Sequence, residues 1–201
     1  MRHRPPGPGP GCRRAHRHRR RPARASLDAA RAKPGADRVT WVEGGAEVLP
    51  GGAYDVAVMT SHVAQFVVDD DEWRRVLAAL RRALRTGGRL LFDSRDPADR
   101  RWERWNPVDS RRSVRLPDGS DVVTWTEVTE ARDGVVRFTR HFGFADGEVR
   151  GEAVLRFRTE RELRDSLAGA GFRVQRIHGG WQGEPVGAGD DGEFVVVATA
   201  L

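Results

Sequence analysis

Residues 54–92, YDVAVMTSHVAQFVVDDDEWRRVLAALRRALRTGGRLLF, contain the signals that decide the fold. Residues 54–59 include an unbroken apolar run, which is typical of a strand covered on both faces in a parallel sheet. The aspartates at 69–71 can cap a helix, whose apolar residues recur at helical spacing until the glycine pair at 87–88 ends it. Residues 89–92 then form a second buried strand. This order predicts a right-handed crossover in a parallel sheet.

The alternation of helix and strand extends in both directions from this stretch. Residues 26–33 predict the end of a helix that stops at a Pro-Gly pair, and residues 38–43 predict a short strand with Val39, Trp41 and Val42 buried.

Residues 159–162, Thr-Glu-Arg-Glu, form a capping box that opens another helix. Two strands follow at 173–178 and 193–199. The chain is therefore predicted to be an α/β protein.

A different period appears in the middle of the chain. Residues 122–128, 135–144 and 149–157 alternate apolar and polar side chains, and Asp-Gly pairs separate them at hairpin spacing. We expect a small antiparallel β insert over residues 113–157. Such an insert is a candidate specificity element, and its strands also offer edges that can pair two subunits into a homodimer.

The positive charge of the chain is concentrated in its first residues. Residues 1–24 contain nine arginines and no acidic residue, so 26 of the 35 basic residues remain against 29 acidic residues in the rest of the chain. We expect residues 1–25 to be a disordered leader rich in Arg, Pro and Gly.

Three hypotheses account for this leader. It is a basic arm that binds nucleic acid, although no aromatic residue is interleaved for base stacking, so a nucleic-acid partner is not favoured. It is a targeting peptide, although it has no apolar stretch after its basic start. It is a frame-shifted or misassigned start, because Arg, Pro, Gly, Ala and His dominate it in a chain whose residue usage suggests a GC-rich gene.

The composition of the chain argues against membrane, disulfide-rich and zinc-binding proteins. No apolar run reaches the roughly 20 residues of a membrane helix, so no membrane association is expected. The single cysteine, Cys12, excludes an internal disulfide, and a reducing cytoplasm is the expected location. The histidines of the leader lack the paired spacing of a zinc module, and no metal is expected.

Three stretches together resemble class I S-adenosylmethionine-dependent methyltransferases, namely residues 54–66, 84–90 (LRTGGRL) and 167–172 (LAGAGF). In that family the helix before the fifth strand usually ends in Leu-Arg/Lys-Pro-Gly-Gly, and here Thr86 replaces the proline. The resemblance covers residues 26–201, which we expect to form a partial methyltransferase domain. It implies a Rossmann-like, mostly parallel sheet with strand order 3-2-1-4-5-7-6, truncated at its N-terminus, with the antiparallel insert after the fifth strand.

The resemblance also implies S-adenosylmethionine as the cofactor, held by a glycine-rich turn after the first strand and by an acid after the second. The chain has no convincing copy of either feature. Residues 7–11, Gly-Pro-Gly-Pro-Gly, have glycines at the family spacing, but the two prolines lack the N–H that the cofactor needs. We therefore expect weak or absent cofactor binding. Without a first strand, residues 55–59 would form an unpaired apolar edge, and we expect poor solubility.

The resemblance indicates where the cofactor would lie. Relatives commonly have Gly-Asp-Ala where this chain has Gly44-Gly45-Ala46, with the acid on the adenine amino group; a plain turn is the alternative. The other expected cofactor residues follow the fourth strand. The full set is Gly44, Gly45, Ala46, Met59, Thr60, Ser61 and Val63.

His62 is the candidate catalytic residue, because transfer of a methyl group to oxygen or nitrogen benefits from removal of a proton and imidazole titrates near neutrality. A purely orienting role is the alternative, since many such reactions need only aligned partners.

The expected substrate contacts lie after the fifth strand and in the insert. Asp93 and Arg95 end that strand, although Asp93 would serve equally as a solvated turn acid. Trp102, His141 and Trp181 could form an aromatic lid, together with Trp105, or pack in the core.

The sequence therefore predicts methyl transfer from S-adenosylmethionine to a small-molecule acceptor, impaired if the glycine-rich loop is absent. A non-catalytic binding protein with the same fold, an RNA-associated methyltransferase that uses the basic arm, and a dinucleotide oxidoreductase are the alternatives.

Overall fold

The structure, a computed structural model, describes residues 24–188 and 192–201. The hypotheses about the leader therefore concern residues outside this range, except that residues 24 and 25 begin the first helix. The helices are α1 (Arg24–Arg31), α2 (Asp70–Ala83) and α3 (Glu160–Gly169), and the 3-10 turns are η1 (Ala36–Arg38), η2 (Ala46–Val48), η3 (Val63–Phe66), η4 (Pro97–Asp99) and η5 (Arg101–Arg104). The strands are β1 (Tyr54–Met59), β2 (Leu84–Arg95), β3 (Arg112–Arg115), β4 (Asp121–Arg132), β5 (Val135–Phe144), β6 (Gly147–Arg156), β7 (Phe172–His178) and β8 (Glu193–Ala200).

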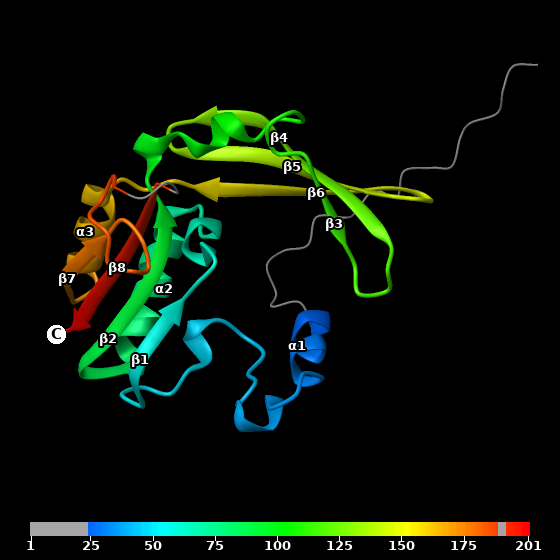
Figure 1. The fold of residues 1–201 in the computed structure, drawn as a ribbon. Coiled ribbons are helices and arrows are strands. Elements are labelled where there is room, and N and C mark those ends of the chain that lie inside the picture. The colour runs from blue at the N-terminus through cyan, green and yellow to red at the C-terminus, as the bar shows by residue number, and fades with distance from the viewer. Residues whose placement is uncertain (1–23, 189–191) are drawn as a thin grey trace, which may run out of the picture.

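The first sheet has the strand order β1-β2-β8-β7 (Figure 1). β1 and β2 are parallel and are joined by α2, which confirms the strand, helix, strand unit. β8 runs antiparallel to both β2 and β7. The α/β fold predicted from the sequence is therefore present, with an antiparallel last strand in its sheet.

Local signals begin and end the helices of this sheet. The Asp69 carboxylate accepts a hydrogen bond from the backbone N–H of Glu72 and caps α2. Thr159 and Glu162 form the predicted capping box of α3. α2 ends at Ala83, earlier than the glycine pair at 87–88, because Leu84 is already extended and its buried side chain belongs to β2.

The core of the domain lies on one face of the first sheet. α2 contributes Trp73 and Leu77, and α3 contributes Leu163 and Leu167, all packed in one buried cluster with residues of β2, β7 and β8. Each fully buried leucine contributes about 1.5–3 kcal/mol by leaving water. Both long helices therefore cover the same face of the sheet.

The expectation that β1 is covered on both faces is wrong. Ala57 and Met59 pack on the core, whereas Val56 and Val58 are 50% and 55% exposed. β1 pairs only with β2, so it is an edge strand among the described residues.

The strand expected at residues 38–43 is also wrong. η1 ends at Arg38, the following residues form no strand, and Val39 and Val42 are 49% and 46% exposed. A strand needs a partner for its backbone groups, and the described residues place none beside this segment. Trp41 instead donates its indole N–H to the carbonyl of Ala36.

The second sheet has the strand order β3-β4-β5-β6 and is antiparallel throughout (Figure 1). It contains the three strands expected from the alternating pattern and one more, β3, before them. Val136, Leu155 and Phe157 form a small core on one of its faces, against which Trp102 and Trp105 pack. None of the described helices is long and apolar enough to cross a membrane.

Candidate functional site

The turn after β1 has an unusual backbone. Ser61 and His62 both adopt positive φ angles, 60° and 59°, which are uncommon for residues other than glycine. Asp93 of β2 holds this turn, because its carboxylate accepts the backbone N–H groups of Ser61 at 3.1 Å and His62 at 2.8 Å. Asp93 is 3% exposed, and these charge-assisted hydrogen bonds satisfy its buried oxygens. The loop carrying His62 is thus fixed by a buried carboxylate.

The side chain of His62 meets a second acid. Its Nε2 lies 2.6 Å from Oε1 of Glu193, at the start of β8, and both side chains are less than a fifth exposed. Glu193 stands beside β2 because β8 pairs with β2 in a register that puts it opposite Arg95. Residues that are 131 positions apart therefore form one His–Glu pair at the carboxyl end of the parallel strands.

A polar layer lies beside this pair. The buried Gln65 accepts a hydrogen bond from Arg95 through its Oε1 and directs its Nε2 toward the carbonyl of Arg156 at 3.5 Å. The guanidinium of Arg95 also lies over the ring of Trp105, 5.5 Å from its centre. These contacts join the first sheet to the second at the site.

His62, Asp93 and Glu193 each place one ligand atom within 4.8 Å of the others. The sequence did not point to this set, because its expectation of no metal rested on the histidines of the leader. In the structure, the contact of His62 with Glu193 and the two backbone donors on Asp93 account for the position of all three groups.

The predicted cofactor residues fall into two groups. Met59, Thr60, Ser61 and Val63 surround His62 at the end of β1. Gly44, Gly45 and Ala46 lie at the start of η2, whose Glu47 carbonyl accepts a hydrogen bond from Arg82 near the end of α2. No hydrogen bond among the described residues joins the two groups.

The turn at 44–46 is organised around Glu47. Its carboxylate accepts the N–H of Gly45, and backbone hydrogen bonds from Glu47 and Gly45 hold the pKa of Glu47 below its ordinary value. A Cβ at Gly45 would meet this carboxylate, which lies at the end of a flexible side chain and would have to move aside. The N–H of Ala46 donates no hydrogen bond within the described part of the chain.

The predicted substrate residues are only partly brought together. Asp93 and Arg95 lie at the site, with Asp93 engaged by the backbone. Trp102 packs edge-on against Phe157, and Trp105 packs against Phe138, in the core of the second sheet.

His141 and Trp181 lie outside the His62 cluster. His141 is buried in the second sheet, stacked on Trp125 at 4.6 Å, with Nδ1 2.8 Å from Glu148. Its Nε2 forms no hydrogen bond with any described residue, although Oε2 of Glu127 lies 3.5 Å from it. Trp181 is 50% exposed in the loop before β8.

Sequence reasoning missed Glu193. It stands at the first position of a predicted strand, where an acidic residue usually faces solvent. The one available signal was its place at the start of the antiparallel last strand, where the resemblance puts it next to the end of the fifth strand. Gln65 was missed for a related reason, because polar residues in a short turn rarely become buried.

Comparison with known proteins agrees with the fold described above. Residues 21–92 match the family model of a methyltransferase domain. No curated protein sequence matches the chain.

Among solved structures, the chain is similar to an S-adenosylmethionine-dependent methyltransferase from Clostridium acetobutylicum, with a TM-score of 0.68 and 14% identity over 89% of this chain and 72% of that one. It is similar to the methyltransferase CcbJ from Streptomyces caelestis, with a TM-score of 0.66 and 19% identity over 87% and 73% of the two chains.

It is also similar to CalS10 from Micromonospora echinaspora, with a TM-score of 0.60 and 22% identity over 89% of this chain and 71% of that one. At these identities the structural matches show a shared fold. The chain thus shares the fold of S-adenosylmethionine-dependent methyltransferases, and its residues 21–92 match the model of a methyltransferase domain.

Proposed function

We propose that the chain transfers a methyl group from S-adenosylmethionine to a nitrogen or oxygen of a small-molecule acceptor, with His62 as the general base. The observation that carries this proposal is the His62–Glu193 contact of 2.6 Å, located at the carboxyl end of the parallel strands. Ligands of open α/β sheets bind at this end.

The contact with Glu193 determines how His62 can act. A neutral imidazole that donates its Nε2–H to the Glu193 carboxylate has its lone pair on Nδ1. Nδ1 forms no hydrogen bond within the described residues, and the ring is partly accessible. His62 can therefore accept the proton of an acceptor hydroxyl or ammonium at Nδ1, while Glu193 stabilises the imidazolium that forms.

The residues present fit the cofactor in two respects. The acids Asp93 and Glu193 suit a ligand that carries a positively charged sulfonium, and the unused N–H of Ala46 is a donor for a base edge. S-adenosylmethionine supplies the methyl group when bound. The residues that would hold it are Gly44, Gly45, Ala46, Met59, Thr60, Ser61 and Val63.

The class of acceptor is proposed from a structural relative. CalS10 is described as an amino pentose methyltransferase. Arg95, which the buried Gln65 positions near His62 by accepting its hydrogen bond, is a polar group of the kind that orients a sugar. We infer an acceptor with an amino or hydroxyl group on a sugar-like ring.

The test is release of S-adenosylhomocysteine in the presence of amino sugars and their hydroxyl analogues. The wild-type chain is expected to turn over, and His62→Ala should lower kcat by about 100-fold or more, the usual contribution of a general base. Glu193→Gln should lower kcat less, while Arg161→Gln on the exposed face of α3 should have no effect. Equal activity of the His62 variant and the wild type would contradict the role of His62.

A calorimetric titration with S-adenosylhomocysteine separates the alternatives. Weak binding with measurable turnover supports an impaired cofactor site. A folded chain with neither binding nor turnover is a binding protein of this fold. Salt-sensitive RNA binding that is lost when residues 1–24 are deleted would favour the RNA-associated alternative.

A further inference from the structure

Three side chains of metal-binding type meet at the carboxyl end of the parallel strands. His62 follows β1, Asp93 lies near the end of β2, and Glu193 begins β8. Each places one ligand atom within 4.8 Å of the other two. The pairing of β2 with β1 and with β8 fixes the elements that carry them. Three nitrogen or carboxylate ligands with an open fourth position are the donor set of many zinc sites.

The cluster is close to the size that a zinc ion requires. Zinc lies about 2.0–2.2 Å from imidazole nitrogen and carboxylate oxygen, so two ligand atoms in a tetrahedral site are roughly 3.4 Å apart. The Nε2 of His62 and the Oε1 of Glu193 are 2.6 Å apart, and the Asp93 oxygen lies within 4.8 Å of both. Side-chain shifts of about 1–1.5 Å therefore admit the ion.

Asp93 already has the support that a metal ligand needs. One of its oxygens accepts the backbone N–H of Ser61 at 3.1 Å, and the other accepts that of His62 at 2.8 Å. A carboxylate has about four lone-pair sites, so two remain for an ion. Carboxylates that bind metals are themselves usually held by hydrogen bonds of this kind. The buried Asp93 is therefore oriented before an ion binds.

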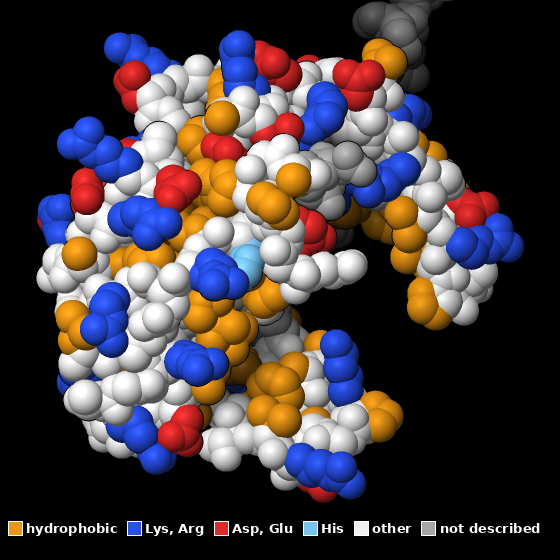
Figure 2. Space-filling view, turned by 60° about the vertical axis from the view of Figure 1, so that its left-hand side comes forward, with side chains coloured by type: hydrophobic (Ala, Val, Ile, Leu, Met, Phe, Trp, Pro, Cys, Tyr) orange, Lys and Arg blue, Asp and Glu red, His pale blue; other side chains and the backbone are white. Residues whose placement is uncertain are grey.

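The charge of the cluster also favours a cation. Elsewhere on the described surface acids lie beside arginines, as in the ion pair of Asp55 with Arg85, and acidic and basic side chains are interspersed across the face in view (Figure 2). Asp93 and Glu193 instead meet a histidine, and with a neutral imidazole the cluster carries two negative charges. Both carboxylates are largely shielded from water, which strengthens their repulsion. A divalent ion neutralises them.

We propose that His62, Asp93 and Glu193 bind Zn²⁺ and that the bound ion inhibits the reaction. A metal on Nε2 of His62 requires that the neutral imidazole carry its proton on Nδ1. The lone pair on Nδ1, which would accept the proton of the methyl acceptor, is then absent. This inhibition rests on the proposed function, whereas the zinc site does not. Mg²⁺ and Ca²⁺ are poor occupants, because they prefer all-oxygen coordination with more ligands.

Competition with a chromophoric chelator measures zinc binding by the full chain without cofactor or acceptor. The first residues of the chain themselves offer zinc ligands, so the background chain carries Cys12→Ser, His3→Ala, His16→Ala and His18→Ala. We expect this background chain to bind about one Zn²⁺. Absence of zinc binding in this background, or equal affinity for Mg²⁺, overturns the proposal.

Carboxylate variants of the background chain locate the ion. Glu193→Gln should weaken zinc binding by at least about tenfold, since even groups that only support a ligand contribute that much. The matched control is Glu148→Gln. Glu148 lies 2.8 Å from the ring of His141, but it belongs to no three-ligand group of the described residues, so this variant should bind zinc normally. Equal affinity of the two variants overturns the proposal.

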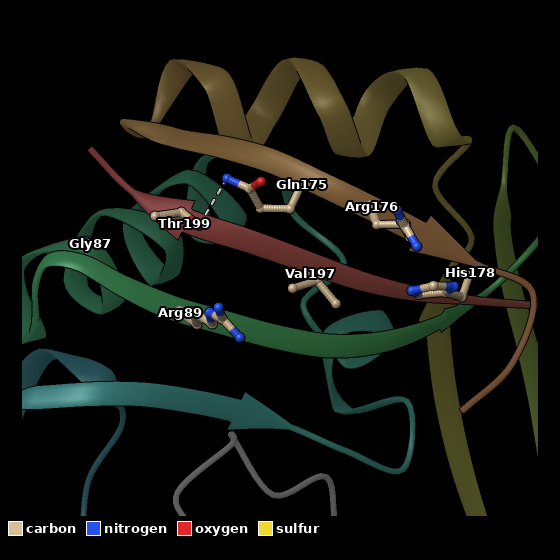
Figure 3. A pocket seen from close by; sticks show the side chains of 7 residues that line it. All are labelled: Gly87, Arg89, Gln175, Arg176, His178, Val197 and Thr199. Atoms are coloured by element: carbon tan, nitrogen blue, oxygen red, sulfur yellow. Dashed lines mark hydrogen bonds between the residues drawn. The ribbon is translucent and has the colours of Figure 1, made fainter. Parts of the chain in front are cut away.

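Histidine variants test the imidazole ligand. His62→Asn should weaken zinc binding, whereas His178→Asn should not. His178 lines a hollow of about 490 Å³ together with Arg89 and Arg176, whose charges repel a cation (Figure 3). Urea midpoints check that all variants fold. Co²⁺ bound in place of Zn²⁺ gives a visible spectrum that depends on its ligands, and an unchanged spectrum in His62→Asn overturns the proposal.

Turnover separates the zinc site from the proposed function. In the assay of S-adenosylhomocysteine release, zinc should lower the rate in proportion to the fraction of chains that hold the ion, and a chelator should restore it. An unchanged rate at saturating zinc overturns the inhibitory role. Turnover with the chelator present tests methyl transfer alone, and chelator competition without cofactor tests the zinc site alone, so the failure of one is distinguishable from the failure of the other.

Discussion

The carboxylate of Asp93 is expected to stabilise the turn that carries His62. Removing its charge should therefore lower the free energy of unfolding by a measurable amount. Its carboxylate accepts two backbone N–H groups from residues with positive φ, and it is 3% exposed. In Asp93→Asn one oxygen can still accept one N–H, but the amide nitrogen faces the other donor. Hydrogen bonds to charged groups are worth about 1.5–3 kcal/mol each, so losing one and neutralising the other should lower the free energy of unfolding by about 2–4 kcal/mol.

Urea unfolding followed by circular dichroism measures this change, with Asp96→Asn as the matched control. Asp96 accepts one N–H, from Ala98, at the exposed start of η4. Asparagine caps as well as aspartate, so the control should change stability by less than about 0.5 kcal/mol. An equally small effect of Asp93→Asn would refute the idea that this carboxylate holds the turn.

Three further perturbations test other parts of the structure. Thr159→Ala removes the capping box with Glu162 and should lower the free energy of unfolding by about 1 kcal/mol, measured by urea unfolding; no change would mean the cap is not formed. The hydrogen bond from His141 lowers the pKa of Glu148, so the charged carboxylate stabilises the fold above the ordinary carboxyl pKa, and this stability is lost as the pH falls through the lowered pKa. Glu148→Gln should therefore weaken the loss of stability at acid pH, measured by urea unfolding at several pH values. An unchanged acid dependence would mean that other groups cause it. Val58→Lys places a charge at an exposed position of the edge strand β1, which should reduce self-association measured by light scattering. Unchanged self-association would mean that another surface mediates it.

Several elements were predictable because their signals are local. The cap at Asp69, the capping box at Thr159 and the hairpin turns each depend on residues within a few positions of one another. The strand expected at 38–43 had a suitable pattern but no partner among residues 24–188 and 192–201, and a strand is stable only when neighbouring backbone groups complete its hydrogen bonds. The error therefore came from treating pairing as a property of the segment alone.

In the candidate site, too, some features followed from local sequence and others depended on long-range pairing. The position of His62 after β1 indicated a functional role, because the carboxyl ends of parallel strands collect ligands. Position in the chain did not indicate that Glu193 contacts His62, or that the Asp93 carboxylate accepts hydrogen bonds from the backbone of the His62 turn. Both depend on the register between β2 and β8, which brings together residues far apart in the chain.

The sequence by itself determined the order of helices and strands, the caps, the alternating second sheet and the methyltransferase resemblance, because these are set by periodicity and by short-range hydrogen bonds. The tertiary structure alone decided which residue would contact His62 and which face of the first sheet α2 and α3 would cover. The reason is physical: burial and long-range pairing depend on how strands align across the whole sheet, and that alignment has no local signal.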